Sequence, residues 1–154
     1  MKKRFFKGLA ILGVVGAFVA CSSDDDNNDS TIDASDLPAA GIALIEVHFE
    51  GATVTRAEMK NKADADGTLY EVTLSNGFDI DLDAEGNWTD IDGNGQQVPD
   101  ALVPAPILEY TDEHYPDPLF IESIDTEPAG YDVEISDGTD LDFDAEGNFV
   151  RVDQ

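Results

Sequence analysis

The sequence predicts an α+β fold in which a helix packed on a three- to four-stranded antiparallel sheet occurs twice in tandem. Three observations lead to this prediction: an internal repeat, an apolar stripe at helical spacing at the start of each copy, and alternating strands after it. Residues 70–92 align with residues 131–153 without a gap, at an offset of 61, and 12 of the 23 aligned positions are identical. Self-similarity of this extent indicates a duplicated structural unit.

Composition divides the 154 residues into five segments. We expect a signal peptide at 1–20, an acidic tether at 21–35, a first copy at 36–92, a linker at 93–100 and a second copy at 101–154. One copy of about 55 residues would bury only a marginal core. Two copies that pack together or share one sheet would be more stable, and the sequence leaves both arrangements open.

The N-terminal segment is typical of an exported protein. Four of its first seven residues are basic, and an apolar run follows at 8–20 that is too short to span a bilayer comfortably. The end of this run, Phe18-Val19-Ala20-Cys21, resembles a lipobox, and Cys21 is the only cysteine of the chain. We expect Cys21 to be lipidated and to be the only link to a membrane. The alternative is an ordinary signal peptide with a cysteine placed there by chance.

Residues 22–30 are polar and acidic and contain no apolar side chain. This composition predicts a disordered tether. The segment also resembles the serine-plus-acidic signal that sends some lipoproteins to the outer face of the outer membrane. We therefore expect an outer membrane lipoprotein exposed at the cell surface, with the periplasmic leaflet as the alternative.

The net charge narrows the class of partner. Without residues 1–20 the chain keeps four basic and all 34 acidic residues, a formal charge of −30. Such a surface repels phosphate backbones, which excludes nucleic acid, and it disfavours direct adhesion to anionic lipid. A basic protein, a cation or simple solubility fits better.

Each copy begins with residues typical of a helix. Asp36 can cap the first helix and Pro38 falls in its first turn, where the missing N–H group costs no hydrogen bond. Pro104 falls at the same place in the second copy, and Pro116 prevents that helix from continuing. Apolar residues, aromatic residues and one histidine then recur at helical spacing. The two stripes are Leu37, Gly41, Leu44, Ile45, His48 and Phe49, and Val103, Ile107, Tyr110, Thr111, His114 and Tyr115.

A β-hairpin is expected after each helix, because apolar and polar residues alternate at 70–74 and 78–83. A three-residue turn with Gly77 left-handed would pair Val72 with Ile80, and the second copy would pair Val133 with Leu141. A slip of one residue would bury aspartates, so we predict this register. A further strand is expected before each hairpin, near 52–62 and 118–126.

The loop Asp-Ala-Glu-Gly at 83–86, repeated at 144–147, is typical of a type I turn followed by a left-handed glycine. These loops would place Trp88 beside Leu82 and Phe149 beside Phe143. Ile91 is out of phase with Trp88, so we expect a bulge or a strand end between them.

The residues that carry a family resemblance are Tyr70, Val72, Leu74, Gly77, Ile80, Leu82, Asp83, Gly86 and Trp88, repeated as Tyr131, Val133, Ile135, Gly138, Leu141, Phe143, Asp144, Gly147 and Phe149. In this pattern the chain resembles the PepSY-like, β-lactamase-inhibitor-like family, in two tandem copies. The resemblance implies an α+β fold similar to β-lactamase inhibitory protein and no catalytic residues. It also implies a protein-binding module that could act as an inhibitor, with a protease or other hydrolase as partner, while the charge of the chain suggests a basic one.

The polar face of the two hairpins is the candidate binding face. Its residues are Glu71, Asp79, Asp81, Asp132, Glu134, Asp140 and Asp142. In the expected register several of these carboxylates lie opposite one another, which is destabilising. A face kept acidic at this cost indicates a cationic partner or Ca²⁺. The alternative is the solvated face of a very acidic protein, screened by salt within roughly 8–10 Å.

Ca²⁺ is a further candidate ligand. Asp90, Asp92 and Asn94 resemble the first half of an EF-hand loop, but position 12 of that loop is Ala101 where a glutamate is needed. The alternative is that these residues begin a turn-rich linker. A calcium- or cation-responsive structural module is therefore the second expected function.

The sequence gives weaker evidence for other kinds of functional site. A carbohydrate or small-molecule binder is the third expected function and would need Trp88 exposed. His48 and His114 occupy equivalent positions in the two copies, which indicates packing. The sequence contains no nucleophile or phosphate-loop motif, so we expect no enzymatic activity.

Overall fold

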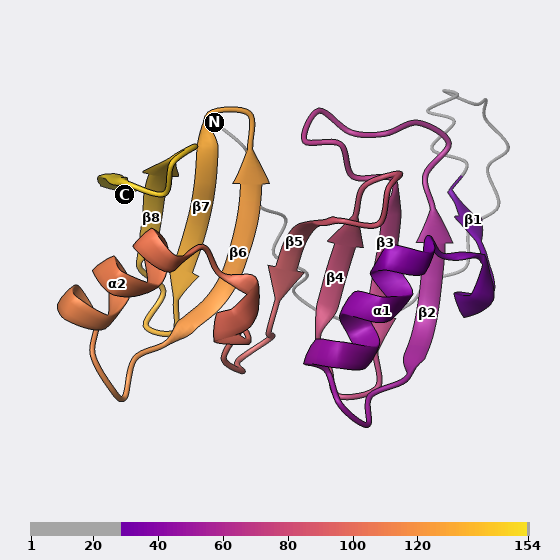
Figure 1. Ribbon diagram of the computed structural model, residues 1–154, viewed down its shortest axis with the longest axis horizontal. Coiled ribbons are helices and arrows are strands. Elements are labelled where there is room, and N and C mark those ends of the chain that lie inside the picture. Colours follow the sequence, from indigo (N-terminus) through magenta and orange to yellow (C-terminus); the bar gives the residue numbers. More distant parts are fainter. Residues whose placement is uncertain (1–28, 154) are drawn as a thin grey trace, which may run out of the picture.

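The computed structural model describes residues 29–153 as an antiparallel sheet with two α-helices on one face (Figure 1). The predicted signal peptide and Cys21 lie outside the described residues. The elements are β1 Ser30–Thr31, η1 Ala34–Asp36, α1 Ala39–His48, β2 Val54–Met59, β3 Tyr70–Leu74, β4 Asp79–Leu82, β5 Trp88–Asp92, η2 Asp100–Leu102, α2 Ala105–His114, β6 Ile121–Glu127, β7 Gly130–Ile135, β8 Asp140–Asp144 and β9 Phe149–Asp153, where η denotes a short 3-10 helix.

All nine strands belong to one sheet, in the order of the chain from β1 to β9. The predicted fold class, a tandem of separate helix-on-small-sheet units, is therefore wrong: the fold is mostly β, a single nine-stranded antiparallel sheet with two α-helices. The junction is β5 with β6, which pair through Asp90 with Asp125 and Ile91 with Ile124. An edge at β5 would leave a row of unpaired backbone groups, and pairing with β6 satisfies them.

The hairpin registers agree with the sequence prediction. Val72 pairs with Ile80, and Val133 pairs with Leu141. The amide of Leu74 donates to the carbonyl of Phe78 at 2.8 Å, which closes a three-residue turn with Gly77 at φ +95°. The alternation of apolar and acidic residues thus fixed the register of both hairpins.

The two Asp-Ala-Glu-Gly loops also form as predicted. In the first, the amide of Gly86 donates to the carbonyl of Asp83 at 3.1 Å, and the amide of Asn87 donates to Asp83 Oδ1 at 2.8 Å. Gly86 has φ +88°, and a Cβ there would lie 2.6 Å from the amide nitrogen of Gly41 in α1. Only glycine fits this close approach of helix and loop.

The strands that follow these loops pair as expected from the sequence. Trp88 pairs with Leu82 and Phe149 with Phe143, and each pair lies next to a register shift. This irregularity explains why Ile91 is out of phase with Trp88 along β5.

One apolar core lies between the sheet and the helices, which both lie in front of the sheet in Figure 1. Ile107 of α2 is 0% exposed and Ile45 of α1 is 5% exposed. Ile91 and Ile124, at the junction of the two halves, are also fully buried. The residues that alternate with this core point to the opposite face of the sheet, which no described helix covers.

Candidate functional site

A row of seven carboxylates crosses the helix-free face of the sheet, one from each strand from β2 to β8. Each member is the cross-strand partner of the next: Glu58, Glu71, Asp81, Asp90, Asp125, Asp132 and Asp142. We call these seven residues the acid ladder. Adjacent strands are about 4.8 Å apart, so the acid ladder extends over roughly 29 Å.

A second acidic row runs beside the acid ladder on the same face. It lies two residues away along each strand, which keeps the side chains on the same side of the sheet. Its members from β4 to β9 are Asp79, Asp92, Ser123, Glu134, Asp140 and Asp153. The face therefore carries two rows of acidic side chains, in which Ser123 is the one uncharged residue among those named.

The structure brings together every residue of the sequence-predicted binding face. Glu71, Asp81, Asp132 and Asp142 lie in the acid ladder, and the other three predicted residues lie in the second row. Asp90 and Asp92, which the sequence assigned to a calcium loop, lie in the same two rows as residues of β5.

Two members of the acid ladder, Glu58 and Asp125, were not predicted from the sequence. Their strands were expected only approximately, near 52–62 and 118–126. The alternation that marks them is short: Ala57 and Ile124 are buried, and the acid that follows each one faces the other way. The pairing of β5 with β6, which makes the row continuous, had no signal in the sequence.

Basic side chains of the chain itself contact both ends of the acid ladder. Lys60 Nζ lies 2.6 Å from Glu71 Oε1, and an Arg56 guanidinium nitrogen lies 2.5 Å from Glu58 Oε2. At the other end, Arg151 of β9 pairs with Asp142 and donates a hydrogen bond to its carboxylate. Ammonium and guanidinium groups are thus already accommodated by this face at three positions.

Asp81 shows the electrostatic cost of the row. Burial and the neighbouring Glu71 carboxylate raise the pKa of Asp81 to about 7, although Lys60 acts in the opposite direction. For Lys60 itself, burial alone would lower the pKa, but hydrogen bonds to Glu71 and Asp64 outweigh burial and raise it. The acid ladder therefore raises the pKa of one of its own members, Asp81, and that of Lys60, which pairs with Glu71.

The predicted calcium residues make contacts within the chain. Asp92 Oδ1 accepts a hydrogen bond from the amide of Asn94 at 2.7 Å. The side-chain amide of Asn94 donates to Asp79 Oδ2 and to the carbonyl of Gly77, both at 2.9 Å. Asn94 therefore ties the loop after β5 to the β3–β4 turn. Across residues 29–153, no group of three or more histidines, cysteines, aspartates and glutamates is arranged to hold a metal ion.

Trp88, Tyr110 and His114 pack against neighbouring aromatic rings. Trp88 is half-buried, with its ring 6.4 Å from that of Tyr131. Tyr110 stacks on Phe149 at 4.4 Å and on His114 at 4.1 Å between ring centroids. His114 Nδ1 also lies 2.9 Å from the carbonyl oxygen of Tyr110. His48 is half-buried at the end of α1.

Comparison with known proteins places this fold in one family. The family model described as "Putative beta-lactamase-inhibitor-like, PepSY-like" matches residues 68–151. This match begins just before β3 and ends within β9. It crosses the boundary that the sequence predicts between two copies, so two separate copies of the family stay a prediction. No curated protein matches the chain.

Three solved structures with a similar fold come from Bacteroides species. One, described as a "putative calcium-regulated periplasmic protein" from Bacteroides thetaiotaomicron, is 31% identical with a TM-score of 0.73, over 82% of this chain and 98% of that chain. A "putative periplasmic protein" of the DUF2874 family from Bacteroides vulgatus is 30% identical with a TM-score of 0.73, over 86% and 100%. Another "putative periplasmic protein of unknown function" from Bacteroides vulgatus is 26% identical with a TM-score of 0.74, over 82% and 99%.

The described helices give no sign of a membrane span. Neither α1 nor α2, each of 10 residues, is long and apolar enough to cross a bilayer.

Proposed function

Because the chain belongs to the PepSY-like family, we propose that it is a non-catalytic binding module of the bacterial envelope, and that the acid ladder binds a cationic segment of another protein. The observation that carries this proposal is the uninterrupted row of seven carboxylates on the helix-free face. A chain that needed only solubility could scatter its charges, whereas here they occupy one row across seven neighbouring strands.

A cationic partner would relieve the repulsion between neighbouring carboxylates of the acid ladder. Like charges directly opposite each other across strands are destabilising. Asp81 carries part of this cost, because burial first and then the Glu71 carboxylate raise its pKa to about 7. Lysine and arginine side chains of a partner would neutralise the row, as Lys60 and Arg151 do at two of its members. Complementary charge of this kind speeds association and selects the partner.

Location in the envelope is supported by the relatives, which are described as periplasmic, and by the predicted signal peptide. We propose that Cys21 carries a lipid anchor, with display on the outer membrane as one arrangement and the periplasmic leaflet as the other. Metabolic labelling with a palmitate analogue tests the anchor. Label in the native chain and none in Cys21→Ala would support it, and an unlabelled native chain would exclude it.

The family description supports inhibition of a hydrolase or protease as the consequence of binding. Bound over the acid ladder, the module would block a partner whose basic surface surrounds its active site. Activity of the captured partner, measured with and without a molar excess of this protein, tests this point. Undiminished activity of a saturated complex would leave binding without inhibition.

Capture from an envelope extract with the purified protein as bait tests the binding function. The ladder variant Asp81→Asn/Asp90→Asn/Asp125→Asn should lose the partner, and raised salt should elute it from the native protein. A matched control, Glu46→Gln/Glu109→Gln/Glu113→Gln, removes three charges from exposed residues of α1 and α2 and should retain it. Equal capture by both variants, or no capture at low salt, would refute the acid ladder as the binding surface.

Calcium is the second candidate. One solved relative is described as calcium-regulated, and the two acidic rows offer oxygen ligands of the kind Ca²⁺ prefers. In this alternative Ca²⁺ would neutralise the rows and stiffen the sheet. A rise in melting temperature with millimolar CaCl₂, absent with MgCl₂ and lost in the ladder variant, would favour it. Equal effects of the two salts would reduce calcium to screening.

A further inference from the structure

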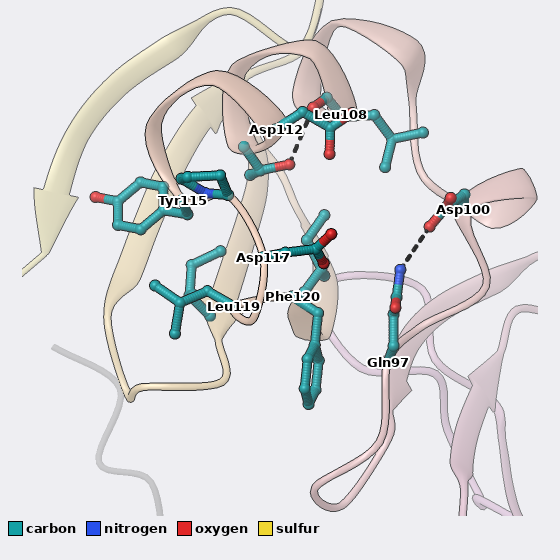
Figure 2. A pocket seen from close by; sticks show the side chains of 12 residues that line it. Gln97, Asp100, Leu108, Asp112, Tyr115, Asp117, Leu119 and Phe120 are labelled. Atoms are coloured by element: carbon teal, nitrogen blue, oxygen red, sulfur yellow. Dashed lines mark hydrogen bonds between the residues drawn. The ribbon is translucent and has the colours of Figure 1, made fainter.

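A pocket of about 340 Å³ opens on the helix side of the sheet, between α2, η2 and the segment from 115 to 121 (Figure 2). Its apolar wall includes Leu108, Phe120 and Ile121. Three aspartates, Asp100, Asp112 and Asp117, stand among the twelve lining residues, and none of the twelve is lysine, arginine or histidine. The pocket is separate from the acid ladder, because α2 lies on the opposite face of the sheet.

The pocket lies beside α2, and the packing there differs from the packing beside α1 in the first half of the chain. In the first half Phe49 and Phe78 are 4% and 6% exposed, and their ring centroids lie 4.9 Å apart, so aromatic rings fill the space beside α1. At an offset of 61, Thr139 aligns with Phe78. The second half therefore lacks the buried aromatic pair that packs beside α1.

The wall of the pocket is also more polar than its counterpart. At an offset of 66, Thr111 aligns with Ile45, and Tyr115 aligns with Phe49. Thr111 is 5% exposed and donates its hydroxyl hydrogen to the carbonyl of Ile107 at 3.0 Å. Thr111 makes less apolar contact at this position than Ile45 makes at the aligned position of the first half.

The acidic groups are placed to meet a ligand. Gln97 Nε2 donates to Asp100 Oδ1 at 2.9 Å, which holds that carboxylate at one side of the pocket. Figure 2 shows the Asp117 side chain directed toward the middle of the lining residues. Three carboxylates beside an apolar wall favour a ligand with one cationic end and a short apolar body.

We propose that this pocket binds an alkylammonium group, with the alkyl chain against Leu108, Phe120 and Ile121 and the ammonium among the three aspartates. The same chemistry occurs in the side chain of an exposed lysine and in a free aliphatic amine. The volume lies at the small end of the range of ligand sites, which suits a group of this size.

Titration of the isotope-labelled protein with hexylamine, followed by amide NMR spectra, tests the proposal. Saturable shifts are expected at residues 97–121, with hexanoate, of equal chain length and opposite charge, giving none there. Asp112→Asn/Asp117→Asn should weaken hexylamine binding about fivefold through the loss of two partly exposed charge contacts. Glu46→Gln, the aligned change in α1, should leave it unaltered.

Two further measurements keep the test decisive. Thr111→Ile, which introduces the first-half residue without changing charge, should weaken binding by narrowing the pocket. In the native protein the affinity should fall as salt rises, which needs no variant. Absent saturation, equal binding of hexanoate, or salt-independent affinity would overturn the proposal.

One comparison distinguishes the two sources of the alkylammonium group, a lysine side chain of a protein and a free aliphatic amine. Binding of an N-acetyl-lysine amide as tight as that of hexylamine would identify a lysine side chain of a protein. Binding of hexylamine alone would identify a free amine, because the peptide backbone would then clash at the mouth of the pocket.

Discussion

Asp90 of β5 lies directly opposite Asp125 of β6, at the seam where the two halves of the sheet join. On the other face of the same seam, Ile91 lies opposite Ile124, and both are 0% exposed. One pair of strands therefore closes the apolar core and makes the acidic row continuous. The fold and the candidate binding face depend on the same pairing.

The first prediction concerns this seam. Ile124→Ala should destabilise the protein by about 2–5 kcal/mol, because it leaves a cavity at a fully buried position. Both halves should still unfold in a single transition, since they share one sheet and one core. Chemical denaturation followed by far-UV circular dichroism measures this, with Val150→Ala, at a position 57% exposed, as the control. Two separated transitions in the native protein would show that the halves fold independently.

The second prediction concerns Asp81. Its pKa in the folded chain is about 7, whereas an unfolded aspartate has a pKa of about 3.9. Between these values the unfolded chain loses the proton and the folded chain keeps it, so stability falls as pH rises through this window and is lowest above it. Asp81→Asn removes this loss and should stabilise the protein by about 1–3 kcal/mol at pH 8, with the gain vanishing below pH 4.

The groups that surround Asp81 define the control for that experiment. Glu71 and Asp90 flank it on β3 and β5, Asp125 acts from β6, and Lys60 and Asp66 act from the segment before β3. Asp79→Asn changes an exposed carboxylate on the same strand and face, so its gain should be much smaller. Thermal melts from pH 3.5 to pH 8 compare the two variants. Equal pH profiles for both would show that burial of Asp81 is not the cause.

The third prediction concerns the contact of Gly86 with α1. Gly86→Ala should cost about 3 kcal/mol or more, because the new Cβ meets the backbone of Gly41 and the residue is left-handed. Gly95→Ala is the matched change: φ is +91° but no atom lies within 4 Å of the new Cβ, so only about 1–2 kcal/mol is expected. Urea denaturation of both variants gives the difference, and equal losses would exclude the close approach as the reason for glycine.

Local features of the fold could be predicted from the sequence because each follows from a short-range rule. The alternation around Val72 and Ile80 and the left-handed Gly77 determine a hairpin without any knowledge of the rest of the chain. The bulge beside Trp88 follows from the phase of Ile91. These features were predicted correctly.

The sheet as a whole could not be predicted in this way. Pairing of β5 with β6 is a contact across the helix α2, and neither strand carries a residue that selects its partner. The predicted fold class failed at this pairing, and with it the continuity from Asp90 to Asp125. The hydrogen bonds of Asn94 to Asp79 and Gly77 could not be predicted either, because these acceptors lie 15 and 17 residues earlier in the chain.

The most direct test of the acid ladder as a binding surface is zero-length carbodiimide cross-linking of the captured complex, mapped by mass spectrometry. This reagent joins a partner lysine only to a carboxylate it touches. If the acid ladder is the binding surface, cross-links form at Asp81, Asp90 and Asp125. Cross-links confined to the acids of α1 and α2, such as Glu46 and Glu109, would contradict it.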